Sequence, residues 1–189
     1  MEIKLIDRTG DPNGTLLIAL SVCRHKQGTM AVLKNSIKAG HTSLLEHVSF
    51  TFYVEGISRR CLEQQGRHRI GVSPTVESQR AVDMSDFLSH TPEDIANDVC
   101  RFAVFHHAVE AARRGYKQLV DMGINREDAA YLLPEACYTT EVLTMNGRAI
   151  RHFYTLRADG AAQAEIQEMA NRIRELVEPI CPVIFHGFV

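Results

Sequence analysis

The segment from His47 to Glu55 constrains the fold of this 189-residue chain more than any other part of it. Two sets of side chains alternate along the segment. The apolar set is Val48, Phe50, Phe52 and Val54, and the second set is Ser49, Thr51 and Tyr53. A period of two residues is typical of a β-strand, in which successive side chains point to opposite faces. We therefore expect a strand here, with the apolar face packed in a core.

Other segments predict helices and two more strands. Short strands are expected at residues 1–7 and 138–144, where β-branched and aromatic residues gather. Residues 16–22 form either a helix or a buried strand, because periodicity does not separate the two. Helices are expected at residues 30–37, 57–65, 126–132, 146–154 and 161–177. With no repeat or linker, residues 1–189 read as a single α+β domain.

A long helix is expected to begin at Thr91 and to run to about Met122. Thr91 offers a capping hydroxyl, Pro92 suits the first helical position, and acidic residues follow in the first turn. Gly123 is expected to end this helix, since glycine readily adopts the left-handed conformation found after helices.

Composition excludes several classes of function. The chain has 21 Lys and Arg against 23 Asp and Glu, so no basic surface for nucleic acid is implied. No apolar run is long enough to span a bilayer, and the first ten residues lack the features of a secretory signal, so we expect a cytoplasmic protein with no membrane partner. The five cysteines are scattered without metal-ligand spacing, and no metal site is expected.

The densest anion-binding chemistry lies between residues 67 and 80. Arg67, Arg69 and Arg80 flank a Gly, Ser and Pro segment that predicts an irregular loop. Any one of them could be an ordinary surface ion-pair donor. Three guanidinium groups around one loop favour a binding site for a phosphorylated ligand, because arginine binds phosphate with two parallel hydrogen bonds. Neither GxGxxG after a strand nor GxxxxGK[ST] occurs, so side chains must hold the phosphate.

Several motifs together resemble the flavin-dependent thymidylate synthases. The Arg67-His68-Arg69 loop resembles the arginine-histidine-arginine signature of that family. The segments 146–153, 156–158 and 181–188 are similar to its second flavin and substrate segment and to its C-terminus. Shorter likenesses lie at 19–23, 40–47 and 58–64. The resemblance covers nearly the whole chain, and it implies a mostly antiparallel sheet packed with long helices.

The resemblance also implies a homotetramer that binds FAD where subunits meet. The residues expected at the flavin are Thr42, Glu46, Arg67, His68, Arg69, Asn146, Arg148 and His152. Those expected around a pyrimidine nucleotide are Gln64, Glu77, Ser78, Gln79, Arg80 and Arg157. His41 is expected near the approach of folate and nicotinamide, and it joins Arg157 as a candidate catalytic residue.

The implied chemistry is methylation of a uracil ring at C5, with methylenetetrahydrofolate as one-carbon donor and NADPH as reductant. The ring must become electron-rich at C5 without a protein nucleophile, so a fixed cation should stabilise its enolate-like form, and Arg157 is our candidate. We expect guanidinium groups from the two distant stretches, 67–80 and 148–157, to meet, across protomers of the tetramer, around a stacked flavin and pyrimidine.

The chain departs from the family pattern at the expected nucleotide side. Val76 stands where an acidic or amide residue is usual, the loop before Ser78 is one residue longer, and Glu77 is adjacent to that serine. Ala130 replaces an arginine before Leu133-Pro134. Three functions therefore stay open: methylation of dUMP to dTMP, methylation or hydroxymethylation of UMP or another pyrimidine nucleotide by a paralogue, and a non-catalytic nucleotide-binding module.

Overall fold

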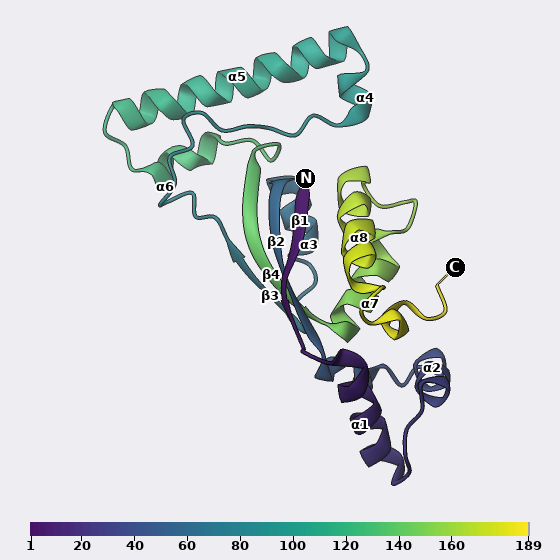
Figure 1. The fold of residues 1–189 in the computed structure, drawn as a ribbon. Coiled ribbons are helices and arrows are strands. Elements are labelled where there is room, and N and C mark those ends of the chain that lie inside the picture. Colours follow the sequence, from purple (N-terminus) through teal and green to yellow (C-terminus); the bar gives the residue numbers. More distant parts are fainter. Residues whose placement is uncertain (189) are drawn as a thin grey trace. The chain divides into compact units, whose positions relative to one another are not determined.

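The structure is a computed structural model that describes residues 1–188 (Figure 1). The chain divides into two compact units, which are described separately. Unit 1 comprises residues 1–54, 66–75 and those from 142 onward. Unit 2 comprises residues 55–65 and 76–141. The division falls within three of the strands, because each of β2 (49–58), β3 (72–76) and β4 (138–146) contains a boundary between the units.

The chain has an α+β fold, as the sequence predicts. Residues 1–188 contain four strands in the order β1-β2-β4-β3, and these are β1 Glu2–Arg8, β2 Ser49–Ser58, β3 Val72–Val76 and β4 Tyr138–Asn146. Neighbouring strands are antiparallel: the end of β1 meets the start of β2, where the Thr9 amide donates to Ser49 O, and Thr51 of β2 hydrogen-bonds Thr144 of β4 at 3.0 Å. The predicted alternation in β2 is confirmed, because Phe50, Phe52 and Val54 are fully buried.

The prediction of an irregular loop throughout residues 67–80 is wrong in its middle part. Val72–Val76 forms the edge strand β3, and the Asn146 amide donates to the carbonyl of Gly71 beside it. Pro74 lies inside this strand. Proline has no N–H to donate, but an edge strand tolerates it because one side of the strand has no neighbour to bond. Pairing with β4 thus outweighs the turn-forming composition.

The described residues of unit 1 form four α-helices and two short 3₁₀ helices. They are α1 Pro12–Arg24, α2 Met30–Lys38, η1 Thr42–His47, α7 Gly147–Arg157, α8 Ala164–Val177 and η3 Pro182–Phe185. The open choice for residues 16–22 is resolved in favour of a helix. Helix α8 lies beside α7 and contacts β1 (Figure 1). Its apolar residues Ile166, Met169, Ala170, Ile173 and Val177 are buried, and α8 packs against α7.

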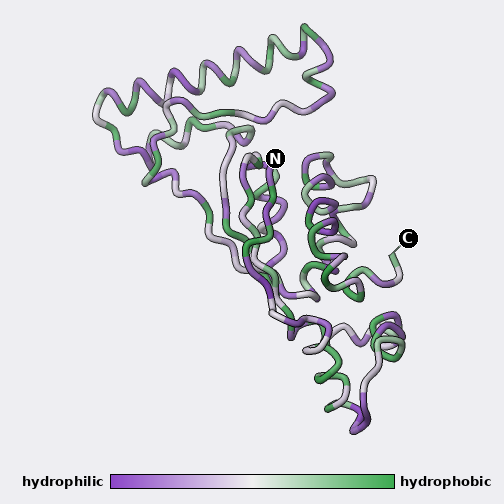
Figure 2. Tube along the Cα trace, in the orientation of Figure 1, coloured by the Kyte–Doolittle hydropathy of each residue, from purple (hydrophilic) through white to green (hydrophobic). Residues whose placement is uncertain are grey.

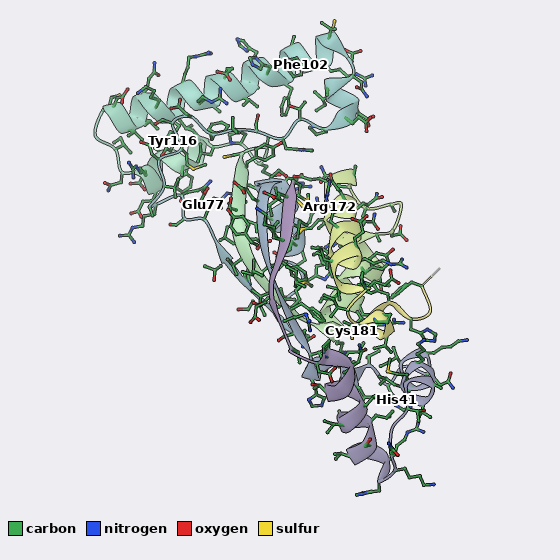
Figure 3. The ribbon with its side chains drawn as sticks, in the orientation of Figure 1. His41, Glu77, Phe102, Tyr116, Arg172 and Cys181 are labelled. Atoms are coloured by element: carbon green, nitrogen blue, oxygen red, sulfur yellow. The ribbon has the colours of Figure 1, made fainter. Side chains whose placement is uncertain are left out.

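Unit 2 contains α3 Arg59–Gln65, α4 Glu93–Ala96, α5 Val99–Asp121, α6 Arg126–Ala129 and the 3₁₀ helix η2 Ala130–Leu132. Its core gathers Met84, Phe87, Val109, Tyr116, Ala129 and Cys137. The Tyr116 hydroxyl is anchored there, since it accepts from the Met84 amide at 3.2 Å. Figure 3 shows Tyr116 and Phe102 toward opposite ends of α5. Hydrophobic and hydrophilic residues alternate along this helix (Figure 2), which is typical of a helix with one buried side.

The single helix predicted from Thr91 to Met122 is in fact two. Asp98 caps a new helix by accepting from the Arg101 amide at 2.8 Å, so α4 ends at Ala96 and α5 starts at Val99. Thr91 makes no cap, because the N-cap position of α4 is Pro92, without a side-chain bond. The predicted stop is confirmed: Gly123 has a φ of 87°. Within residues 1–188 no helix is both long and apolar enough to cross a membrane.

Candidate functional site

Unit 1 carries two adjoining cavities. The first, of about 440 Å³, is lined by Thr42, Glu46, Ile70, Asn146, Arg148, Ala149, Arg151, His152 and Thr155. The second, of about 420 Å³, is lined by Arg67, His68, Arg69, Ile70, Val72, Ala149 and His152. Three residues border both cavities, namely Ile70, Ala149 and His152. Every residue that the family resemblance implies at the flavin therefore lines at least one of the two cavities.

Helix α7 positions one wall of the first cavity. Asn146 caps the helix, since its side-chain oxygen accepts from the Ala149 amide at 2.8 Å. The cap fixes the register in which residues 148, 151, 152 and 155 share one face, as residues three and four apart do on a helix. Gly147 allows a close approach, because a Cβ there would lie 2.9 Å from the carbonyl oxygen of Leu45. The start of α7 is thus packed directly against η1, which carries Thr42 and Glu46.

The arginine loop requires glycine at residue 71. Gly71 has a φ of 71°, in the left-handed region that favours glycine. A Cβ at this position would lie 2.6 Å from Cγ of Asn146, so a side chain would collide with the cap of α7. The loop therefore turns tightly over the N-terminus of α7. Ile70, beside the glycine, exposes 90% of its surface above both cavities and offers an apolar platform.

The two arginine-rich stretches meet within one chain. Arg157, the last residue of α7, donates from Nε to Nε2 of His68 at 2.9 Å, although the two residues are 89 positions apart. His68 exposes only 8% of its surface and packs edge-on against Phe153 at 4.9 Å between ring centroids. Burial, followed by the charge of Arg157 and by His152, lowers the pKa of His68 to about 4. The imidazole is therefore neutral at physiological pH.

Arg148 is paired in the first cavity. Its Nη1 lies 2.6 Å from a carboxylate oxygen of Glu46, and the two side chains are about half exposed, at 53% and 45%. An exposed pair of this kind contributes little to stability. It leaves both groups at the cavity surface, where the guanidinium can bind an anion and the carboxylate can accept from a hydroxyl.

The tail that follows α8 is held by Arg151, to which the sequence interpretation assigned no role. Its Nη1 donates to the carbonyl oxygens of Ile184 at 2.7 Å and His186 at 2.9 Å. The guanidinium also stacks on Phe188, 4.5 Å from the ring centroid. No sequence pattern marks this contact, because the acceptors are backbone groups 33 and 35 positions away.

His41 lies outside the lining of both cavities. It is exposed in the turn between α2 and η1, and its amide donates to the carbonyl of Ser36 (Figure 3). Its neighbour Thr42 does line the first cavity. A role of His41 at the approach of further substrates stays a prediction.

The residues expected on the nucleotide side lie in unit 2, except Arg157. Glu77 follows β3 (Figure 3), where its amide donates to Thr140 and its carbonyl accepts from Arg59 Nη2 at 3.0 Å. Ser78 is exposed, and its hydroxyl accepts from the Arg80 amide at 3.3 Å. Gln64, on α3, and Gln79 are partly buried.

Arg80 makes an ion pair in a small cavity of unit 2. Its Nε lies 3.1 Å from a carboxylate oxygen of Glu127, and the arginine side chain is 81% exposed. Asn125 and Arg126 complete the lining of this cavity of about 310 Å³. Arg126 donates to Ala81 O at 3.0 Å. Two guanidinium groups thus share a small, open cavity, a suitable place for an anionic group.

Two buried polar side chains of unit 2 escaped the sequence interpretation. Glu141 and Gln65 each expose 1% of their surface, and among residues 1–188 neither carboxylate oxygen of Glu141 nor either amide atom of Gln65 has a hydrogen-bond partner. Burial raises the pKa of Glu141 to about 7. Its place in the alternation of β4 could have indicated burial, because Leu143 and Met145 follow it on the same face.

The cavities of unit 1 fit a flat aromatic cofactor that carries phosphate. Arg67, Arg69 and Arg148 supply guanidinium donors for phosphate, while Ile70 and Ala149 supply apolar surface for a ring. Their combined size exceeds what a simple phosphate would need. Within residues 1–188, no group of three or more His, Cys, Asp or Glu could hold a metal ion.

Comparisons with known proteins agree on one family. Residues 4–183 match the family model described as Thy1, thymidylate synthase complementing protein. The chain is 37% identical to a flavin-dependent thymidylate synthase of Geobacter sulfurreducens, with 98% of this chain and 85% of that protein covered. It is 30% identical to the protein of the same name from Clostridium tetani, with the same coverage. A Pyrococcus abyssi relative of that name is 39% identical over 77% of this chain and 62% of its own length.

Proposed function

The chain belongs to the Thy1 family of thymidylate synthase complementing proteins, and on this basis we propose that it is an FAD-dependent methyltransferase that converts dUMP to dTMP. The observation that carries the proposal is the meeting of the two arginine-rich stretches around the cavities of unit 1, with Arg157 bonded to His68. Relatives named flavin-dependent thymidylate synthase support the same activity.

FAD would be held by residues that line the two cavities. Arg67, Arg69 and Arg148 would bind its phosphates, because guanidinium groups offer paired donors. Thr42 and Glu46 would bind its hydroxyl groups, and His152 would lie between the two cavities. In this proposal FAD, once reduced by NADPH, would supply the hydride that completes the new methyl group, and methylenetetrahydrofolate would supply the carbon.

Arg157 would stabilise the charge that develops on the pyrimidine. Electron density at C5 rises when negative charge is stabilised at the opposite edge of the ring, and a fixed cation does this best in a site that excludes water. A guanidinium suits the role, since it stays charged and its plane can be held by neighbours. His68 is such a neighbour, at 2.9 Å.

The family resemblance also implies nucleotide ligands among the residues of unit 2. We propose Gln64, Glu77, Ser78, Gln79 and Arg80 as these ligands. Arg80 would exchange its ion pair with Glu127 for the phosphate, a change that costs little because the pair is exposed. Ala130, where the family has an arginine, removes one charge-assisted contact, worth about 1.5 to 3 kcal/mol if nothing replaces it. Arg126 stands four residues earlier, beside Arg80 in the same small cavity.

The family resemblance implies a homotetramer, and we propose that His41 lies at the approach of folate and nicotinamide. The cytoplasm remains the proposed location.

The test is a direct comparison of dUMP and UMP as substrates. Purified protein is supplied with FAD, NADPH and methylenetetrahydrofolate, and the methylated product is measured for each nucleotide. We expect a preference for dUMP. A strong preference for UMP would instead favour the paralogous enzyme. The altered loop at Val76 and the absence of an arginine at residue 130 would then explain the change in nucleotide preference. Protein that neither contains nor takes up flavin, followed by its absorbance, would favour a non-catalytic binding module.

A further inference from the structure

His68 has a contact that flavin binding alone does not explain. Its Nε2 accepts the Nε–H of Arg157 at 2.9 Å. We propose that His68 is a positioning residue that sets the direction of the Arg157 guanidinium toward the pyrimidine. This inference rests on the function proposed above, and it adds that the arginine-histidine-arginine loop controls the cation on the nucleotide side.

The geometry of arginine gives the contact its effect. The guanidinium is planar, so fixing the direction of Nε–H also fixes the plane and the two terminal nitrogens. Arg157 ends α7, and its side chain carries about 2 kcal/mol of rotamer entropy. Its place at the end of the helix does not by itself fix the direction of the guanidinium. An acceptor on a rigid neighbour reduces the cost of ordering it before the nucleotide arrives.

His68 is itself held firmly. It is one of the few buried polar residues of unit 1, at 8% exposure. Its ring packs edge-on against Phe153 at 4.9 Å and lies 5.6 Å from the ring of His152. Phe153 is fully buried in α7, so the imidazole is held against the same helix that carries Arg157. The acceptor and the donor thus share one rigid support.

The surroundings of His68 keep its acceptor available. The charged and titratable groups that face it are Arg157 and His152 from α7, together with Arg67 and Arg69 of its own loop. None of the described residues lining this cavity is a carboxylate. Protonation would convert Nε2 into a donor and place two cations together, and the pKa of about 4 excludes this at neutral pH. The proton of the neutral ring is therefore on Nδ1.

Two substitutions separate the acceptor from the ring. His68→Phe keeps an aromatic ring against Phe153 but removes the acceptor. His68→Gln places an amide oxygen at a similar reach and keeps one. We expect His68→Phe to lower kcat/KM for dUMP about tenfold, the effect of one hydrogen bond to a charged group, with flavin absorbance retained. His68→Gln should recover most of this loss. His107→Gln, an exposed change on α5, is the control and should leave turnover unaltered.

A double-mutant cycle with Arg157→Lys tests whether the two residues act together. Lysine has no Nε–H that could donate to His68 in this geometry. In the Arg157→Lys background, His68→Phe should therefore lower kcat/KM for dUMP by less than about threefold. Losses that simply multiply, or a glutamine variant no better than phenylalanine, would overturn the positioning role.

A readout that needs no turnover separates this inference from the proposed function. In protein labelled with ¹⁵N-histidine, the His68 signals are identified by their loss in His68→Gln. We expect the neutral Nδ1–H form and a shift of the Nε2 resonance on Arg157→Lys. A protonated Nε2, or no response to that substitution, would refute the pairing. A wild-type protein with this NMR signature but no uridylate methylation would refute the function and leave the pairing intact.

Discussion

Glu141 places a titratable carboxyl where nothing compensates its charge. It lies in β4 with 1% of its surface exposed, and neither carboxylate oxygen has a hydrogen-bond partner in the part of the chain that the structure describes. Desolvation alone raises its pKa from 4.5 to about 7. A buried charge without a partner is costly, so the ionised form must destabilise the folded protein. Replacing Glu141 by glutamine removes that charge and keeps nearly the same shape.

The size and sign of the effect follow from the raised pKa of Glu141. The folded protein binds the proton more tightly than the unfolded chain, so stability falls as pH rises from about 4.5 and levels off above about 7. A pKa that differs by one between the folded and unfolded states corresponds to about 1.36 kcal/mol, which gives a cost of roughly 3 kcal/mol at pH 8. At pH 5 the cost is below about 1 kcal/mol, since the carboxyl is then mostly protonated in the folded state.

The assay is urea-induced unfolding at several values between pH 5 and pH 8, at one protein concentration. The free energy of unfolding of Glu141→Gln should exceed that of the wild type by an amount that grows with pH to roughly 3 kcal/mol. His68 acts in the opposite direction, because its lowered pKa removes stability as pH falls from 6.5 toward 4. It is the same in both proteins, so its contribution cancels in the difference.

The control is Glu175→Gln, which removes an exposed carboxylate of α8. It should change stability little at any pH. A difference for Glu141→Gln that stays constant across the pH range, or a variant less stable than the wild type at pH 8, would refute the reasoning. Either result would mean that the carboxylate has a partner in the folded protein.

Three further substitutions test the site of unit 1. Arg157→Lys should leave flavin bound, as read from its absorbance, while turnover drops about a hundredfold, the scale of losing one electrostatic stabiliser; turnover near wild type would eliminate this role. Gly71→Ala should cost about 1–2 kcal/mol in urea unfolding for its positive φ, with more from the clash at Asn146, and wild-type stability would contradict the tight turn. Arg151→Met should lower stability by about 1.5 to 3 kcal/mol and speed proteolysis of the tail around Phe188; an unchanged cleavage rate would argue against the tail contact.

Local sequence signals predicted most helices and strands. They failed at positions where two signals favoured different structures. The alternation in β2 was sufficient because burial repeats with the same period of two. From Thr91 the helical pattern continues through Asp98, but that side chain bonds the Arg101 amide and starts a new helix. In β3, pairing with β4 overrode the turn-forming Pro74. Propensity is a weak prior, and hydrogen bonds with distant or competing partners decide such cases.

The candidate site likewise contains residues that could be identified from the sequence and residues that could not. The arginine loop and the start of α7 could be found from residue types, because phosphate chemistry demands guanidinium groups and a helix cap demands a side chain such as Asn146. Arg151 could not, because its partners are carbonyl groups of the C-terminal tail. Glu141 had only a weak signal, because its place in the alternation of β4 indicates burial while an acidic residue is usually found at the surface.

The sequence by itself determined the α+β class, the family, and the residues that bring anion-binding chemistry. These follow from side-chain types and local periodicity, which every short segment carries. Only the tertiary structure decided that Arg157 meets His68 within one chain, that Gly71 must stay free of a side chain beside Asn146, and that Glu141 is buried without a partner. Such features depend on distances between segments far apart along the chain, and the close packing of the folded protein fixes those distances.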